Sequence, residues 1–196
     1  MQKPGIPSRL FTLLALSAGA IFAQPVVRPA PDLTVTEPTG AKTTIAGLKG
    51  KVVVLDFIFT TCPHCQAEGQ MLARLYKEMQ PKGLQVVSVA VNDNAAVLVP
   101  QYVQQFAVPY PVGYAPRETL LKYMGFSEMD LWVVPQVVVI DRKGMIRAQS
   151  PVKGDPNLQS EVYMREMLTK LLAEKSSTTS HSASPAKTPV KTASNQ

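Results

Sequence analysis

The only two cysteines of this 196-residue chain are Cys62 and Cys65, and they follow shortly after an apolar run over Val52–Phe59. A helix that begins at Cys62 would hold both sulfur atoms within its first turn, close enough to form a disulfide bond. The unpaired N–H groups of that turn and the positive end of the helix dipole favour a thiolate on Cys62. The spacing therefore predicts a reactive dithiol at the point where a strand passes into a helix.

The two residues between the cysteines, Pro63 and His64, adjust this chemistry. Pro63 suits the first helical position, because its ring presets φ and its missing N–H would have had no helical acceptor. His64 adds a titratable positive charge beside the sulfur, which favours the thiolate over both the thiol and the disulfide. We therefore predict that Pro63 and His64 tune the redox balance of the pair towards the oxidising side.

Other uses of two cysteines fit this chain less well. A structural disulfide between Cys62 and Cys65 would close a very short loop and constrain the unfolded chain little. A structural zinc site takes about four Cys or His ligands, and the only histidines here are His64 and the distant His181. Copper delivery by a cysteine pair would take a CxxxC spacing. We therefore predict no metal, and no cofactor other than the Cys62–Cys65 disulfide itself.

The first 23 residues have the pattern of a secretory signal peptide. Lys3 and Arg9 give a positively charged start, and the apolar stretch Leu10–Phe22 follows. That stretch is shorter than the ~20 residues of a spanning helix, and Ala23 is a small residue before the cut. An uncleaved membrane anchor stays open as an alternative, because Ile21 is larger than the usual alanine. Either case predicts an extracytoplasmic location, periplasmic or secreted, where disulfides persist.

The rest of the chain divides by composition into a linker, one domain and a tail. Residues 24–31 are rich in proline and predict a linker, and residues 32–173 have the length of one ordinary domain. Residues 174–196 are mostly Ser, Thr, Ala, Pro and Lys, which predicts a disordered tail. Loss of the first 23 residues lowers the net charge from +6 to +4. Because residues 24–173 contain no basic cluster with aromatics among it, we do not predict nucleic-acid binding.

Alternation and helical periodicity divide the domain into strands and helices. They predict strands over 33–37, 52–59, 84–91, 137–140 and 145–149, and helices over 63–80, from the turn at 92–94 to 106, over 118–124 and over 156–173. The stretch 109–116 is predicted to be a loop. The strands at 52–59 and 84–91 enclose a helix, so they should be parallel. The last two strands should form an antiparallel hairpin around the turn 141–144. This order predicts an α/β fold.

Several of these segments, in the same order, resemble the TlpA/ResA-like branch of extracytoplasmic thiol-disulfide oxidoreductases. This branch belongs to the thioredoxin superfamily and is related to the AhpC/TSA redoxins. The resemblance covers residues 30–173. It rests on the leading β-hairpin, GLKGK before the first central strand, the segment DFIFTTCPHC, the additional helix before the third central strand, and Val133–Pro135 ahead of VVVIDRKG. It implies a thioredoxin fold: a central mixed β-sheet flanked by helices, with an N-terminal β-hairpin and an inserted helix.

The resemblance also assigns roles outside the CxxC motif. It implies a cis peptide bond between Val134 and Pro135, opposite the cysteines, where backbone groups hold an extended substrate strand. Taken alone, Pro135 is also simply a proline at the start of a strand. Thr61 stands just before Cys62 and replaces a tryptophan that is usual in the family. We group Thr61 with Val134 and Pro135 as substrate contacts.

Asp56 is the one charged residue in the first central strand. It lies six residues before Cys62, where thioredoxins carry a buried acid and most TlpA/ResA-like proteins carry asparagine. Burial should raise the pKa of this carboxyl group, so that it could accept the proton of Cys65 when that thiol attacks a mixed disulfide. The alternative is a structural aspartate that bonds a neighbouring backbone group or a water molecule.

The predicted activity is thiol-disulfide exchange with protein thiols and disulfides. The Cys62 thiolate attacks a partner disulfide, and Cys65 then attacks Cys62 and releases the reduced partner. The resemblance implies a reductant that receives electrons through the membrane and supports cytochrome maturation or disulfide repair, and it is consistent with an antioxidant activity. We therefore expect a membrane electron-transfer partner.

Three alternatives stay open at this point. The Pro63-His64 dipeptide is shared with the oxidising protein DsbA, which favours a disulfide donor. The segment LDFIFTTCP is similar to the approach to a peroxiredoxin cysteine, although Phe59 replaces the threonine expected three residues before Cys62. A non-catalytic module that binds a partner or a cell-envelope polymer is the third, and it rests on Lys187 and Lys191 in the tail.

Overall fold

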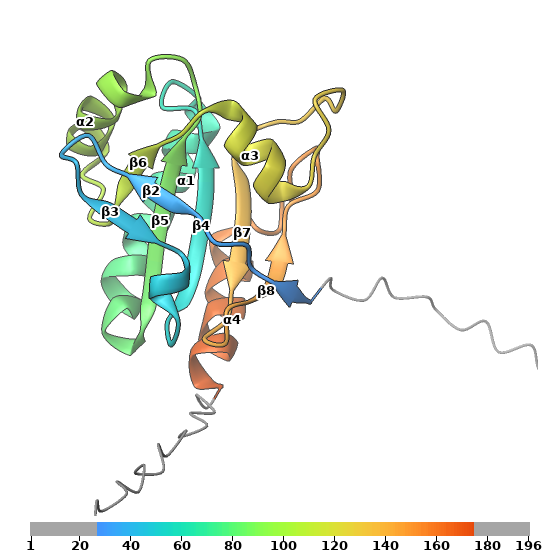
Figure 1. Ribbon diagram of the computed structural model, residues 1–196. Helices are drawn as coiled ribbons and strands as arrows, with labels where there is room; N and C mark the ends of the chain where they lie inside the picture. The colour runs from blue at the N-terminus through green and yellow to red at the C-terminus, as the bar shows by residue number, and fades with distance from the viewer. Residues whose placement is uncertain (1–26, 175–196) are drawn as a thin grey trace, which may run out of the picture.

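An eight-stranded mixed sheet forms the centre of the computed structural model, in the strand order β1-β8-β7-β4-β5-β6-β2-β3 (Figure 1). The structure describes residues 27–174, so the predicted signal peptide and the tail beyond Glu174 lie outside the described residues. The strands are β1 (Arg28–Pro29), β2 (Thr34–Thr36), β3 (Lys42–Thr44), β4 (Val52–Ile58), β5 (Leu84–Ala90), β6 (Val112–Tyr114), β7 (Gln136–Ile140) and β8 (Met145–Gln149).

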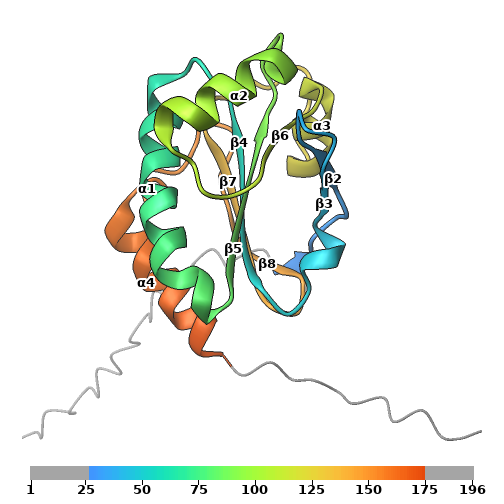
Figure 2. The same cartoon turned by 90° about the vertical axis from the view of Figure 1, so that its left-hand side faces the viewer.

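Four α-helices and two short 3-10 helices accompany the sheet. They are α1 (Pro63–Met79), α2 (Ala95–Phe106), α3 (Arg117–Met124), α4 (Glu161–Ala173), η1 (Ala46–Leu48) and η2 (Gln80–Lys82). Helices α1, α2 and α4 cover one face of the sheet, and α3 lies on the other face beside the β2–β3 hairpin (Figure 2). None of the helices within residues 27–174 has both the length and the hydropathy that crossing a bilayer requires.

The central strand β4 is buried on both faces, because all seven of its residues are covered. Its side chains alternate between two hydrophobic clusters: Val52, Val54 and Ile58 belong to the cluster under α1, α2 and α4. The intervening Val53, Leu55 and Phe57 belong to the cluster under α3. Asp56 falls in the first series by the same period of two, so its carboxyl group is directed towards the face that α1 covers.

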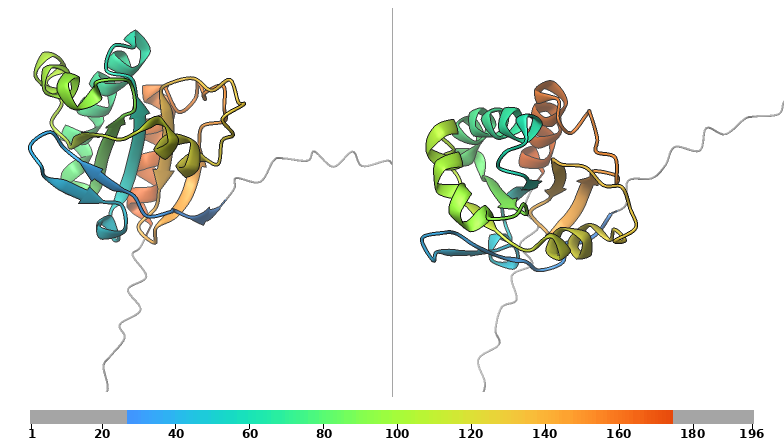
Figure 3. Two further views of the ribbon diagram at one scale, coloured as in Figure 1. Left: turned by 45° about the horizontal axis from the view of Figure 1, so that its top comes forward. Right: turned by 90° about the horizontal axis from the view of Figure 1, so that it is seen from above.

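The strand directions bring the ends of three segments to one end of the sheet. Strands β4 and β5 are parallel, as the predicted βαβ unit requires, while β7 runs antiparallel to β4. The carboxyl end of β4, the start of α1 and the start of β7 therefore meet at the same end of the sheet, which Figure 3 shows from above. The predicted hairpins β2–β3 and β7–β8 are also confirmed.

The prediction of a loop over 109–116 was wrong, because Val112–Tyr114 form strand β6. This strand pairs with β5 in parallel and with β2 in antiparallel orientation. Three residues between two prolines are too few to show a periodic pattern. Gly113 allows this close approach, because a Cβ atom there would lie 2.6 Å from the carbonyl oxygen of Thr36.

Both ends of the domain also differ from the sequence prediction. Arg28 and Pro29 fall in the predicted linker, yet they pair with β8 as a short edge strand. Helix α4 begins at Glu161 and not near residue 156, because Asp155 organises a turn there: its carbonyl accepts the N–H of Gln159 and its carboxylate accepts the N–H of Asn157. Side-chain bonding of this kind competes with helix formation.

Candidate active site

Cys62 is the N-cap residue of α1, with extended backbone angles, and Pro63 occupies the first helical position. The carbonyl of Cys62 accepts the N–H of Gln66, and the N–H of Cys62 donates to the carbonyl of Phe59. These two bonds fix the turn between β4 and the helix. Pro63 and His64 are exposed, Cys62 is half-buried and Cys65 is fully buried. Both cysteines are free thiols. The Cys62 sulfur is therefore open to attack a partner, whereas the Cys65 sulfur is shielded from direct contact with one.

A side-chain clamp that the sequence prediction missed holds this turn. The N–H of Thr60 donates to Oδ1 of Asn92 at 2.9 Å, and the Thr60 hydroxyl donates to the same atom at 3.3 Å. The Gln66 amide donates to the carbonyl of Thr60 at 2.9 Å. Asn92 belongs to the predicted turn at 92–94, and its side chain joins the end of β5 to the residues before Cys62. Only the parallel pairing of β4 and β5 places the two segments side by side.

The peptide bond between Val134 and Pro135 is cis, as the family resemblance implied. Pro135 directly precedes β7, whose first residue, Gln136, pairs with Phe57 near the end of β4. Val134 and Cys62 both pack against the cluster beneath α1. The exposed Thr61 precedes Cys62 at the same end of the sheet. The structure therefore brings Thr61, Val134 and Pro135 to the end that carries Cys62, as the sequence predicted.

Asp56 is completely buried beneath the cysteines. One carboxylate oxygen accepts the hydroxyl of Ser88 on the paired position of β5 at 3.2 Å. The other oxygen has no partner among the described residues. Burial raises the pKa of Asp56 to about 7, against the opposing effect of the Ser88 hydrogen bond. A carboxyl group with this pKa can both take up and release a proton near neutral pH.

Cys65 is the thiol whose proton Asp56 would accept. Burial raises the pKa of the Cys65 thiol far above its usual range, and the negative charge of Asp56 raises it further. Tyr102 on α2 donates its hydroxyl to the carbonyl of Cys65 at 3.4 Å, so α2 also fixes this part of α1. Because the thiol holds its proton so firmly, Cys65 needs a nearby base before it can attack.

Glu68 is a second buried acid, and the sequence prediction did not identify it. It is 4% exposed on α1, one turn after Cys65, and neither of its carboxylate oxygens has a hydrogen-bond partner within residues 27–174. Burial, followed by the charges of Asp56 and Cys62, raises the pKa of Glu68 well above its usual range. A sequence signal was available, since Cys65, Glu68 and Leu72 follow helical spacing on one face. A glutamate inside an apolar stripe marks a buried charge.

The site thus combines an accessible thiol, a buried thiol and two buried carboxyl groups beneath them. Such a set can exchange disulfides and move the accompanying proton without a bound cofactor. Within the described residues, no three or more His, Cys, Asp or Glu side chains gather in a way that could hold a metal ion. The absence of a metal or other cofactor stays a prediction.

A sequence model of the AhpC/TSA family matches residues 26–149, which is more than half of the chain. The chain belongs to the AhpC/TSA family. Among its relatives, the thiol-disulfide oxidoreductase ResA of Bacillus cereus strain ATCC 10987 is 25% identical over 182 residues, which cover 87% of this chain and 99% of the relative. The ResA protein of B. cereus strain ZK / E33L is 32% identical over 140 residues, which cover 71% and 77% of the two chains.

Solved structures place this AhpC/TSA family member among thioredoxin folds. A thiol:disulfide interchange protein of the thioredoxin family from Chlorobium tepidum TLS has a TM-score of 0.63 and 25% identity, and the match covers 74% of this chain and 97% of that one. A secreted thiol-disulfide isomerase from Corynebacterium glutamicum has a TM-score of 0.64 and 18% identity, with 76% and 87% coverage. The TlpA/ResA-like thioredoxin fold is confirmed. This family member is a thiol-disulfide oxidoreductase, and the alternative of a non-catalytic binding module is set aside.

Proposed function

We propose that this protein reduces disulfides in extracytoplasmic protein substrates. The observation that carries the proposal is the stacking of the site: the half-buried Cys62 lies at the helix terminus, and the fully buried Cys65 lies one turn inside it, above Asp56. This arrangement separates the thiol that meets the substrate from the thiol that resolves the complex.

The buried acids favour the reducing direction. A dithiol is a strong oxidant when its reduced form is stabilised, chiefly as a thiolate. Burial, followed by the charge of Asp56, raises the pKa of Cys65 and keeps it as a thiol. The buried site therefore withholds from Cys65 the thiolate stabilisation that makes a dithiol a strong oxidant. His64, which favours the oxidising direction, is exposed to water, where its charge is screened.

Besides the substrate disulfide, the reaction needs one proton, which water supplies. The Cys62 thiolate attacks one sulfur of the substrate disulfide, forms a mixed disulfide, and releases the other substrate sulfur as a thiolate that takes up a proton. Asp56 accepts the proton of Cys65, which attacks the Cys62 sulfur. The second substrate sulfur leaves as a thiolate and takes up the proton that Asp56 releases, and the two electrons that reduce the substrate come from the pair. The product is the Cys62–Cys65 disulfide, and a membrane electron-transfer partner would reduce it again.

The main chain of Val134 and Pro135, which we call the Val134–Pro135 edge, would hold the substrate chain beside Cys62. The N–H and C=O groups of Val134 make no hydrogen bond to another main-chain group within residues 27–174. Unpaired groups of this kind can add an extended peptide by β-type pairing. Thr61, which is exposed next to Cys62 in the chain, would add a side-chain contact to the substrate. The extracytoplasmic location is supported by the signal-peptide pattern at the start of the chain and by the secreted relative.

The equilibrium reduction potential of the Cys62/Cys65 pair tests the direction. The mature protein is titrated in thiol-disulfide buffers at pH 7, with a His64→Ala variant as the control for the charge beside Cys62. A value near about −270 mV, that of thioredoxin, is expected and would support a reductant. A value near about −120 mV, that of DsbA, would make the protein a disulfide donor and contradict the proposal.

Peroxide reduction is the second candidate, because the chain belongs to the AhpC/TSA family. Against it, the position three residues before Cys62 holds Phe59, whose ring packs edge-on against Trp132 with 5.8 Å between centroids and offers no hydroxyl group. A Cys65→Ser variant decides between the two. Continued turnover of hydrogen peroxide by this variant would favour the peroxidase, whereas a trapped mixed disulfide with no peroxide turnover would favour the reductase.

A further inference from the structure

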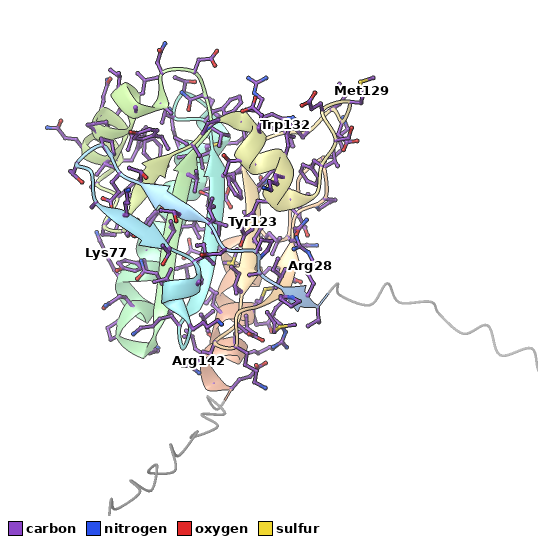
Figure 4. The ribbon with its side chains drawn as sticks, viewed as in Figure 1. Arg28, Lys77, Tyr123, Met129, Trp132 and Arg142 are labelled. Carbon is purple, nitrogen blue, oxygen red and sulfur yellow. The ribbon has the colours of Figure 1, made fainter. Side chains whose placement is uncertain are left out.

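Three apolar side chains stand exposed on the segment that connects α3 to Pro135. Met129 is 89% exposed, Leu131 is 77% exposed and Val133 is 40% exposed. We refer to these three side chains as the apolar ridge. Met129 projects from the outer tip of the segment, and Trp132 lies nearer α3 (Figure 4). Burial of exposed apolar surface is favourable, so a cluster of this kind next to a reactive site marks a binding surface.

The two neighbours of Val133 along the chain, Trp132 and Val134, face inward. The ring of Trp132 packs against Phe59, and the guanidinium group of Arg117 lies 5.5 Å from its centroid. Val134 packs against both hydrophobic clusters. Leu131 and Val133 are thus directed outward while Trp132 and Val134 are directed inward, which is the alternation of an extended strand. Leu131 and Val133 therefore lie on an extended path that leads to Val134 and Pro135, and Met129 lies in the turn that precedes it.

Three hydrogen bonds fix the main chain of the ridge from its inner side. Lys153 Nζ donates to the carbonyl of Leu131 at 2.8 Å, and the N–H of Val133 donates to Val152 at 3.2 Å. The amide of the fully buried Gln136 donates to the carbonyl of Val133 at 2.9 Å. These main-chain groups are occupied, so the ridge offers a partner its side chains. Because it is already ordered, binding costs little conformational entropy.

We propose that the apolar ridge binds apolar side chains of the protein substrate, in the extended segment that flanks the substrate's cysteine. This inference rests on the proposed function, because it takes the Val134–Pro135 edge as the place where that segment pairs. An occupant that reaches both this edge and Cys62 must be a polypeptide that carries a disulfide of its own. Side chains two residues apart on such a strand match Leu131 and Val133. The ridge would thereby select the substrate by sequence.

Two other occupants are less consistent with the structure. A second copy of this chain has no cysteines besides Cys62 and Cys65, which lie in the same site. A membrane surface would meet the carboxylate of Glu128, which is exposed next to Met129. A negative charge at this position opposes binding to anionic lipids.

Two matched peptides test the ridge. Each contains one cysteine as a mixed disulfide with glutathione, and the positions two and four residues away hold leucine in one peptide and serine in the other. The measured quantity is the ratio of kcat/KM for the leucine peptide to that for the serine peptide. We expect a ratio of at least about ten for the full-length protein, and a fall to below about three in Leu131→Ser and Met129→Ser. The matched control is Val162→Ser, a residue 78% exposed on α4 across the sheet, which should keep the ratio of the unchanged protein.

The outcomes separate this inference from the proposed function. A protein that reduces neither peptide contradicts the proposed function itself. A protein that reduces both equally well, or whose ratio is the same in the ridge variants, contradicts the ridge alone. Because a misfolded variant loses both rates together, the ratio does not fall through instability. A dimer in sedimentation, or binding to phosphatidylglycerol vesicles, that Leu131→Ser abolishes would also overturn the inference, because the ridge would then serve a second copy or a membrane.

Discussion

The two sides of the active site differ in what they expose. Beneath Cys62, the site is closed and acidic: Cys65, Asp56 and Glu68 are buried, and three of their four carboxylate oxygens have no partner among the described residues. Beside Cys62, the site exposes Thr61 and the apolar ridge on the segment that leads to the half-buried Val134 and the buried Pro135. The difference indicates that proton and electron chemistry is kept away from water, while recognition uses the exposed side. Cys62 is the residue that belongs to both.

The largest expected effect separates the two cysteines. Cys62→Ser should lower the rate of insulin disulfide reduction by at least about a thousandfold, because the attacking nucleophile is lost. Cys65→Ser should still attack, but it should accumulate a mixed disulfide that mass spectrometry detects under non-reducing conditions. If Cys65→Ser lost as much activity as Cys62→Ser and formed no mixed disulfide, the attack by Cys62 would itself depend on Cys65.

The closed side should also affect stability. The pKa of Asp56 is raised from 3.8 to about 7 by burial, so the folded protein keeps a proton that the unfolded chain has released between these pH values. The free energy of unfolding should therefore fall as pH rises from about 4 to about 7, and then level off. At about 1.4 kcal/mol per pKa unit, the Asp56 contribution is on the order of 4 kcal/mol. In urea unfolding, Asp56→Asn should be the more stable protein at pH 8, and the difference should vanish near pH 3.

A smaller effect concerns the rate at which the closed side resolves the mixed disulfide. Asp56→Asn should slow the attack of Cys65 by about a hundredfold, which is the low end of the range for a positioned general base. In the unchanged protein, this rate should rise as pH passes through about 7, because only the ionised carboxylate of Asp56 accepts the proton. Stopped-flow measurement of substrate release reads this step. An unchanged rate and pH profile in the variant would assign Asp56 a structural role.

The smallest expected effect tests the charge state of Glu68. Burial and the neighbouring charges raise the pKa of Glu68 well above its usual range, which favours the protonated form, and a protonated glutamate resembles glutamine in shape and charge. Glu68→Gln should therefore keep the insulin reduction rate at pH 7 within about twofold. The pH profile of the resolution step should likewise stay that of the unchanged protein, because a protonated Glu68 places no charge beside Asp56. A large loss at pH 7 would show that Glu68 is ionised there and takes part in the chemistry.

Much of the site could be predicted from local patterns. Cys62 and Cys65 are close in sequence, and their effect depends on one helical turn, which Pro63 begins. The βαβ unit and the closing hairpin also follow from periodicity within short segments. The loop prediction over 109–116 failed because β6 has three residues and gains its stability from pairing with both β5 and β2. Such a strand is defined by its neighbours, so its own sequence carries little signal.

Sequence alone determined the reactive pair, its place at a strand-to-helix junction, and the acid in the central strand, because these depend on spacing and on burial of a continuous apolar run. Tertiary structure decided the rest of the site. Glu68 became a buried acid because α1 packs on the sheet, and Asn92 became the clamp on Thr60 because β5 lies beside β4. The exposed apolar ridge likewise depends on Val152 and Lys153, which hold its main chain from the segment after β8. Contacts between segments far apart in sequence arise only when the sheet assembles.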